Sequence, residues 1–231
     1  MRNESKKSKK ILADLKELLK AEQDAGLEWL RLPRHILGPE ILENLGISLR
    51  NCTKCKLASS RSQIVFGEGN PRAKLLFIGE APGAEEDRTG RPFIGKAGEL
   101  LSRIIQAIDL SRDQVYISSI VKCRPPGNRT PEAEEIAACK PFLLQQIMAI
   151  QPVIICTLGS VATQGILNTQ EPITKCRGQF HKYQGIYVMP TFHPAYLLRN
   201  PKDKKLVWED MQKIQVLYRK LGFYDKELDK P

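Results

Sequence analysis

Cysteines are the residues of this sequence with the clearest capacity for chemistry. Cys52 and Cys55 form a C-x-x-C pair, and the short gap lets two thiolates reach one metal centre from a tight turn. Cys123 and Cys139 could complete a set of four thiolates for a tetrahedral zinc ion or an iron–sulfur cluster. Spacing does not separate these metals, and simple burial of Cys123 or Cys139 stays open. The other two cysteines are expected to be core residues or bystanders: Cys156 and Cys176.

A glycine- and acid-rich segment, GEAPGAEED at residues 79–87, follows an apolar run. Its glycines and Pro82 predict a tight turn whose backbone N–H groups can approach a planar ligand or a phosphate. No G-K-[ST] follows, which excludes a phosphate loop of the nucleotide-hydrolase type. The acids equally suit a helix N-terminus. Phe93 stands between turn residues, so it is a candidate stacking platform for a base, although core packing is the usual role of such a ring.

His193 is one of only three histidines and lies in PTFHPAYLLRNP, directly after an apolar run. A lone histidine is often structural, but a place at the carboxyl end of a strand favours a functional role. The residues that follow are apolar and then basic, which suits a wedge entering DNA where a nucleotide is flipped out. The alternative is the first turn of a helix with a solvated charged face. The candidate DNA-contacting residues are Tyr196, Leu197 and Arg199.

Short apolar runs alternate with helical periodicity from residue 73 onward. We expect strands at residues 73–78, 115–121, 153–157 and 186–189, and helices at residues 98–108, 131–150, after Gly159, and 208–221. This alternation predicts an α/β fold, a three-layer αβα arrangement with a mostly parallel central sheet. Ligands in such folds bind beyond the carboxyl ends of the strands. The unusual loops follow the expected strands, so the sequence predicts a single site.

The first part of the chain has a different pattern. Residues 10–23 predict an amphipathic helix, and residues 25–45 resemble a linker with short helical pieces. We therefore expect an N-terminal basic and helical extension at residues 1–45 and one domain at residues 46–231. The net charge is +10, of which residues 1–50 contribute only +2, so the excess is not a basic tail. This charge is compatible with DNA binding without establishing it. With no apolar stretch long enough for a secretory signal or a membrane span, we expect a cytoplasmic protein.

The chain carries several separated motifs that follow one another in a defined order. These are C-x-x-C, GEAPGAEEDRTGRPFIGKAGELL, VYISSIVKCRPPGNRTP, the second cysteine pair, ITKCRG and FHPAYLLRNP. Together they resemble the family 4 uracil-DNA glycosylases, over about residues 45–221. The resemblance implies a uracil-DNA glycosylase-like fold and a DNA repair enzyme that hydrolyses the N-glycosidic bond of uracil in DNA, single- or double-stranded. We expect it to be a monomer. It also implies a [4Fe–4S] cluster held by four ligands: Cys52, Cys55, Cys123 and Cys139.

The same resemblance implies roles for the loop residues. The uracil pocket maps to Glu80, Ala81, Pro82, Phe93, Ser119 and His193. His193 would donate a hydrogen bond to the uracil oxygen where negative charge gathers. Glu86, or Glu80, would orient the attacking water, because Ala81 stands where better-known uracil glycosylases carry aspartate.

Ser119 departs from the family, which usually has asparagine there to read uracil. A hydroxyl makes only part of the hydrogen-bond pattern of an amide. We therefore predict weaker or less selective excision. Two alternatives follow, a non-catalytic DNA-binding or damage-sensing protein of the same fold, and a cluster-bearing protein for electron transfer or partner docking.

Overall fold

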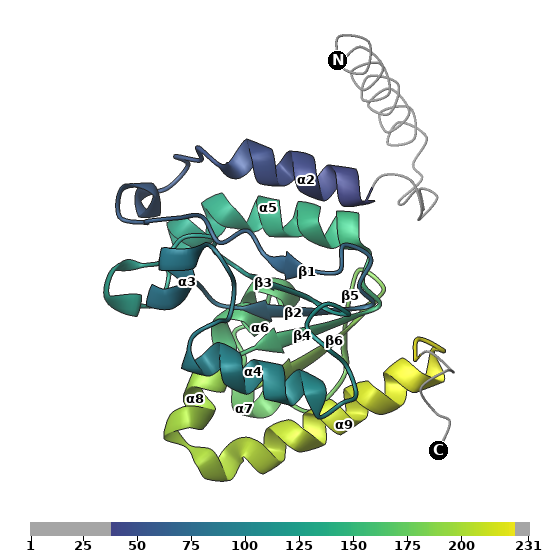
Figure 1. The fold of residues 1–231 in the computed structure, drawn as a ribbon. Helices are drawn as coiled ribbons and strands as arrows, with labels where there is room; N and C mark the ends of the chain where they lie inside the picture. The colour runs from purple at the N-terminus through teal and green to yellow at the C-terminus, as the bar shows by residue number, and fades with distance from the viewer. Residues whose placement is uncertain (1–37, 225–231) are drawn as a thin grey trace, which may run out of the picture. The chain divides into compact units, whose positions relative to one another are not determined.

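The computed structural model describes residues 38–224, which form a six-stranded sheet between two layers of helices (Figure 1). The strand order is β1-β3-β2-β4-β6-β5. The four central strands β3, β2, β4 and β6 run parallel, whereas β1 and β5 pair antiparallel at the two edges. The strands are β1 (Glu68–Gly69), β2 (Leu75–Gly79), β3 (Tyr116–Ser119), β4 (Ile154–Leu158), β5 (His181–Tyr183) and β6 (Ile186–Thr191). The predicted three-layer αβα fold with a mostly parallel sheet is confirmed.

The helices cover both faces of this sheet (Figure 1). The α-helices are α2 (Gly38–Leu49), α3 (Ala84–Thr89), α4 (Lys96–Gln106), α5 (Ala133–Ile150), α6 (Ser160–Leu167), α7 (Ile173–Cys176), α8 (Pro194–Arg199) and α9 (Lys204–Lys220). Short 3-10 helices lie at η1 (Lys56–Ser59), η2 (Pro126–Asn128) and η3 (Pro201–Asp203). Within residues 38–224, no helix combines the length and the apolar character that crossing a lipid bilayer requires.

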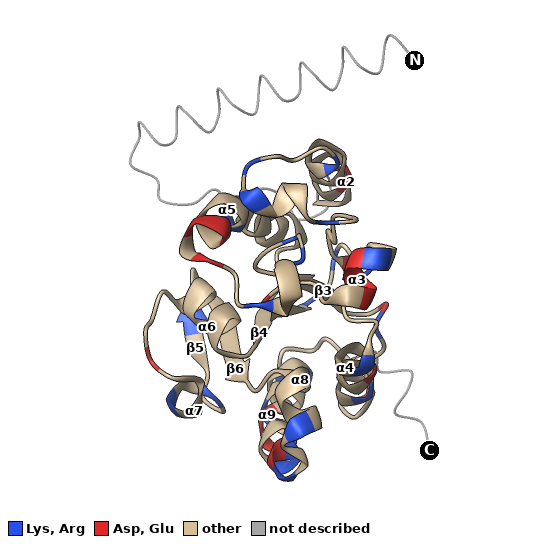
Figure 2. Cartoon of the chain, turned by 90° about the vertical axis from the view of Figure 1, so that its left-hand side faces the viewer, with Lys and Arg blue, Asp and Glu red and all other residues tan. Residues whose placement is uncertain are grey.

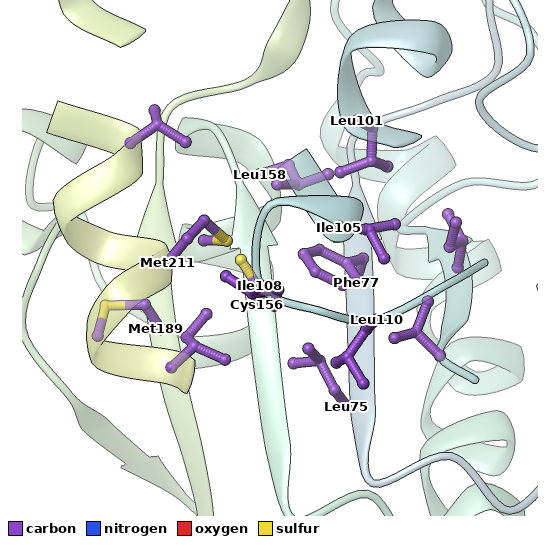
Figure 3. Packing of buried hydrophobic residues seen from close by; sticks show 14 of the residues in the cluster. Leu75, Phe77, Leu101, Ile105, Ile108, Leu110, Cys156, Leu158, Met189 and Met211 are labelled. Carbon is purple, nitrogen blue, oxygen red and sulfur yellow. The ribbon is translucent and has the colours of Figure 1, made fainter. Parts of the chain in front are cut away.

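Strands β2 and β4 are largely apolar on both sides because both of their faces are covered. All five residues of β2 are buried, and alternate side chains enter different halves of the core. Leu75 and Phe77 pack with α4 and α9 (Figure 3), whereas Leu76 and Ile78 pack with α5. This double burial explains why the strands are continuous apolar runs instead of alternating apolar and polar residues.

The structure differs from the sequence prediction at α2. Gly38 and Pro39 suggested a linker, but they open a 12-residue helix, since proline is tolerated in a first helical turn that needs no N–H donor. Leu42 of this helix is buried in the core half that contains α5. The domain boundary expected after residue 45 falls inside α2. The amphipathic helix predicted at residues 10–23 lies outside the described residues.

Candidate active site

The loops that follow the parallel strands meet at one edge of the sheet, which Figure 2 shows face on. The pairing register of the strands explains why these loops lie close together. Gly79, the last residue of β2, is paired with Ser119, the last residue of β3. On the other side, Leu158 at the end of β4 is paired with Thr191 at the end of β6, two positions before His193. Residues distant in sequence therefore emerge side by side.

Phe93 and His193 lie next to each other at this edge, with ring centroids 5.6 Å apart and planes 35° apart. The Phe93 ring covers the end of β2, because a side chain at Gly79 would overlap it. A Cβ atom at Gly79 would also lie 3.5 Å from Ser119 Oγ. Glycine at this position thus leaves the space in which Phe93 approaches the sheet, and Phe93 lies near both Ser119 and His193.

The His193 side chain is held in one protonation state by its surroundings. Burial, aided by the positive charge of Arg199, lowers the pKa of His193 to about 4, although the Glu86 carboxylate opposes this shift. The imidazole is therefore neutral at neutral pH. Its Nδ1 accepts a hydrogen bond of 3.1 Å from the Ala195 backbone N–H in the first turn of α8. The proton must then reside on Nε2, which makes that atom a hydrogen-bond donor.

The two acids of the first loop have different environments. Glu86 accepts three backbone hydrogen bonds, from Gly83 at 3.1 Å, Ile94 at 2.9 Å and Gly95 at 3.0 Å. Its carboxylate thus joins the first turn of α3 to the segment after Phe93. Glu80 instead is half-buried, and desolvation raises its pKa, although Thr130 opposes this through a hydrogen bond. The sequence favoured Glu86 over Glu80 for the attacking water and did not reveal that backbone N–H groups bind the Glu86 carboxylate.

The remaining residues expected in the pocket lie in the same loop or at the end of β3. Ala81 is half-buried and Pro82 is buried, directly after Glu80. Ser119 is 3% exposed, and its backbone carbonyl accepts a hydrogen bond of 2.7 Å from the buried Lys122 ammonium. Burial lowers the pKa of Lys122 to about 7, while Cys139 and Cys123 act in the opposite direction. Apart from its place after a predicted strand, nothing in the sequence marks this lysine as buried beside the site.

Helix α8 presents its candidate DNA-contacting residues in different directions. Leu197 is 1% exposed and packs in the core with α4 and α9, whereas Leu198 is 45% exposed. Consecutive helical residues point about 100° apart, so only one of two adjacent leucines can face the core. The leucine available to DNA is therefore Leu198, and Leu197 anchors the helix. Tyr196 is half-buried with its hydroxyl bonded to Asp203 at 2.6 Å, and Arg199 is exposed.

The four cysteines of the predicted ligand set line one pocket, between the end of α2, η1, the segment after β3, and α5. Backbone and side-chain donors point at their sulfurs. Arg61 Nη1 lies 3.5 Å from Cys123 Sγ, and the Lys122 N–H donates to Cys139 Sγ at 3.3 Å. Burial raises the pKa of Cys123 to about 11, so a thiolate there requires a bound cation.

The pocket is a set of soft sulfur donors, which suits zinc or iron–sulfur chemistry. No three of the His, Cys, Asp and Glu side chains described between residues 38 and 224 are grouped so as to hold a single metal ion. Cys156 and Cys176 are buried elsewhere, as expected.

Comparisons with known proteins agree with this geometry. Residues 66–212 match the model of the uracil DNA glycosylase superfamily. A type-4 uracil-DNA glycosylase from Sulfurisphaera tokodaii is 48% identical over 76% of this chain and 84% of its own length. Similar proteins of the same description occur in Thermotoga maritima, with 44% identity over 79% of this chain and 97% of the relative, and in Saccharolobus solfataricus, with 46% identity over 75% and 85%. The chain therefore belongs to the uracil DNA glycosylase superfamily and, within it, to the type-4 uracil-DNA glycosylases.

Proposed function

We propose that this protein is a DNA repair enzyme that removes uracil from DNA by hydrolysing the N-glycosidic bond and leaves an abasic site. The observation that carries the proposal is the pair of rings, Phe93 over the end of β2 and neutral His193 beside Gly159 at the end of β4, with centroids 5.6 Å apart. One planar base placed against Phe93 lies within reach of both His193 and Ser119. The net charge of +10 suits a DNA partner.

A base stacked in a duplex hides its glycosidic bond, so the nucleotide must leave the stack before it reacts. Phe93 offers an aromatic face for the extruded base. Ser119 offers a hydroxyl toward the same space, and its oxygen both donates and accepts hydrogen bonds. We assign to Arg199, which is exposed on α8, a contact with a phosphate of the DNA strand.

Cleavage of the bond between the sugar carbon and the base nitrogen leaves its electron pair on uracil, which becomes an anion. The Nε2–H of His193 donates to the uracil oxygen where this charge gathers, and a neutral imidazole does so without giving up its proton. Water adds to the cationic sugar carbon, and the proton that it loses ends on the uracil anion, so the products are an abasic sugar and neutral uracil. We assign the orientation of that water to Glu80, because the Glu86 oxygens already accept three backbone hydrogen bonds.

The four-cysteine pocket would hold a [4Fe–4S] cluster. When bound, the cluster supplies a structural cross-link between the end of α2, η1, β3 and α5. The residues that would hold it are Cys52, Cys55, Cys123 and Cys139. Support comes from the all-sulfur donor set, from the shared pocket and from the hydrogen-bond donors aimed at two of the sulfurs.

The proposed activity has a direct test. The purified protein is incubated with oligonucleotides that carry one uracil, single-stranded or paired with guanine or adenine, and the products are treated with alkali. Strand breaks at the uracil position only after alkali are the expected result, since a hydrolytic glycosylase leaves an abasic site without cutting the strand. Intact strands with all three substrates would refute the proposal.

Substitution of Leu198 by alanine is expected to slow excision from double-stranded DNA by about 10-fold and to change excision from single-stranded DNA by less than about 2-fold. An apolar side chain that fills the gap left by a flipped nucleotide matters only where there is a stack to enter, and unstacking costs a few kcal/mol per step. Single-turnover rates on the two substrates measure this. The exposed Val216 on α9, changed to alanine, is the matched control. Equal losses on both substrates would contradict a wedge.

Substitution of Ser119 by asparagine is expected to raise the preference for uracil over cytosine, by about 10-fold or more, because each added specific hydrogen bond is worth about 1–3 kcal/mol of discrimination. An amide presents a donor and an acceptor together, which matches uracil and mismatches cytosine. Single-turnover rates on uracil and cytosine in the same sequence context give the ratio. Ser118→Asn at the neighbouring buried position is the control. An unchanged ratio for Ser119→Asn would mean that this position does not read the base.

A further inference from the structure

The backbone at Phe93 is held in a conformation that phenylalanine rarely adopts. Its φ is +50°, in the left-handed region that is costly for a bulky side chain. Such a conformation persists only where the surrounding structure fixes it. Phe93 is buried against the first turn of α4, where Gly98 leaves room for its carbonyl group, since any side chain at Gly98 would overlap the Phe93 backbone.

Arg112 donates hydrogen bonds to the backbone carbonyl groups of Pro92 and Phe93. It lies in the connection between α4 and β3, and its two terminal nitrogens divide between consecutive backbone oxygens. Nη2 donates to Pro92 O at 2.8 Å, and Nη1 donates to Phe93 O at 3.0 Å. Nη1 also lies 3.3 Å from Ser102 Oγ on α4. The planar fork of a guanidinium matches two neighbouring acceptors in a way that a single ammonium does not.

The two sides of Phe93 are thus fixed by different groups. Glu86 accepts hydrogen bonds from the amides of Ile94 and Gly95, after the ring-bearing residue, and Arg112 donates to the carbonyls before and at it. Glu68 lies 4.0 Å from Arg112, but its close partner is Arg91, at 2.8 Å. Arg112 is therefore directed mainly to backbone oxygens, and its side chain is only 24% exposed.

We propose that Arg112 is a positioning residue for uracil excision, which sets the place and tilt of the Phe93 ring by holding the carbonyls of residues 92 and 93. The inference rests on the proposed function, in which Phe93 stacks on the extruded base. Arg112 touches no substrate. It acts through the strained backbone of Phe93, and loss of its two hydrogen bonds lets that backbone relax toward negative φ and carries the ring away from His193.

The test compares Arg112→Met, which keeps the apolar stem and removes the donors, with Arg112→Lys, which keeps the charge. Arg112→Met is expected to lower the single-turnover rate at saturating enzyme by about 10- to 100-fold, as misplacement of a positioning group by about 1 Å does. Arg112→Lys should fall between Arg112→Met and the unaltered protein. Affinity for undamaged DNA should change by less than about 2-fold, because the guanidinium faces the backbone behind the pocket.

Arg91→Met is the matched control. It removes the close ion pair of the same Glu68 carboxylate but no hydrogen bond to residue 92 or 93, so its excision rate should match that of the unaltered protein. An equal loss in Arg91→Met and Arg112→Met would assign the effect to Glu68 and overturn the proposal.

A double-mutant cycle with Phe93→Ala separates positioning from a general structural role. If Arg112 acts through the ring, Arg112→Met in the Phe93→Ala background should slow excision by less than about 2-fold further. The same fold-loss in both backgrounds, with a parallel fall in melting temperature, would overturn the proposal. Should Arg112→Met not fold, Arg112→Lys in both backgrounds gives the same decision. Absence of excision by the unaltered protein would instead refute the proposed function.

Discussion

Replacement of His193 by alanine should slow uracil excision by about 100- to 1,000-fold, the usual effect of removing one donor to a developing oxyanion. The Nδ1 atom of His193 accepts a hydrogen bond from the Ala195 N–H, so Nε2 carries the proton. Alanine removes that donor, together with the hydrogen bond that Nδ1 accepts from the Ala195 N–H in the first turn of α8. Single-turnover rates on a single-stranded uracil oligonucleotide measure the loss without a contribution from base-pair opening.

The pH dependence adds a second readout for His193. Its pKa is lowered to about 4, chiefly by burial, so the neutral form that donates from Nε2 dominates from about pH 5 upward. We therefore expect no loss of rate as the pH rises through 6.5, the ordinary value for histidine. A rate that falls as the pH rises through 6.5 would show that the imidazolium is the active form and would contradict this mechanism.

His181 provides the control for this substitution. It lies on the edge strand β5, and its Nε2 pairs with the Cys176 carbonyl, away from the site loops. His181→Ala should retain an excision rate within about 2-fold of the unaltered protein. If His193→Ala also stays within 2-fold, the pocket described by Phe93, Ser119 and His193 is not where the chemistry occurs.

The central strands could be predicted because burial of a strand on both faces produces an apolar run that is visible within a few residues of sequence. A parallel strand covered on both faces is usually a continuous apolar run, so AKLLFI and VIICT each identify a strand in the middle of the sheet. Loops that follow such strands meet at one edge, and this rule alone brings Phe93 close to His193 from positions 100 residues apart.

Other features of the fold and the site could not be predicted from the sequence, because they depend on residues that are close in space but distant along the chain. The edge strands β1 and β5 are short, only partly buried and antiparallel, so they lack the apolar run that identifies β2. Two adjacent leucines on a helix look equivalent in sequence, and only the position of the core shows that Leu197 is buried and Leu198 exposed. The same holds for Glu86 and Glu80, whose roles depend on which backbone amides approach them.

The anchoring of the Phe93 segment shows how an aromatic ring can be functional and packed at once. Sequence reasoning set base stacking against core packing, but Phe93 is buried and still adjacent to His193. Hydrogen bonds to the backbone on both sides of Phe93 restrict its ring. The ring therefore has few conformations to lose when a base binds, and the entropic cost of binding is low.

Substitution of Cys139 by serine is expected to abolish the visible absorbance and the iron content of the protein and to lower its melting temperature by roughly 10 °C or more. Loss of a structural metal centre removes several kcal/mol, and each kcal/mol shifts the melting temperature of a domain of this size by about 2–4 °C. Cys139 lies on α5 and would join this helix to the pair Cys52 and Cys55, so its loss removes the cross-link between them. Iron and zinc analysis, absorbance and thermal unfolding measure the three effects.

Cys176→Ala is the matched control, because this thiol is equally buried but lies outside the four-cysteine pocket. It should keep its full iron content. Retention of iron in Cys139→Ser would remove this residue from the ligand set, and one zinc atom per chain in the unaltered protein would replace the cluster by a single-metal site. A loss of iron with full excision activity would show that the metal supports the stability of the segment around the pocket, whereas the reaction depends on the carboxyl ends of β2, β3 and β6 alone.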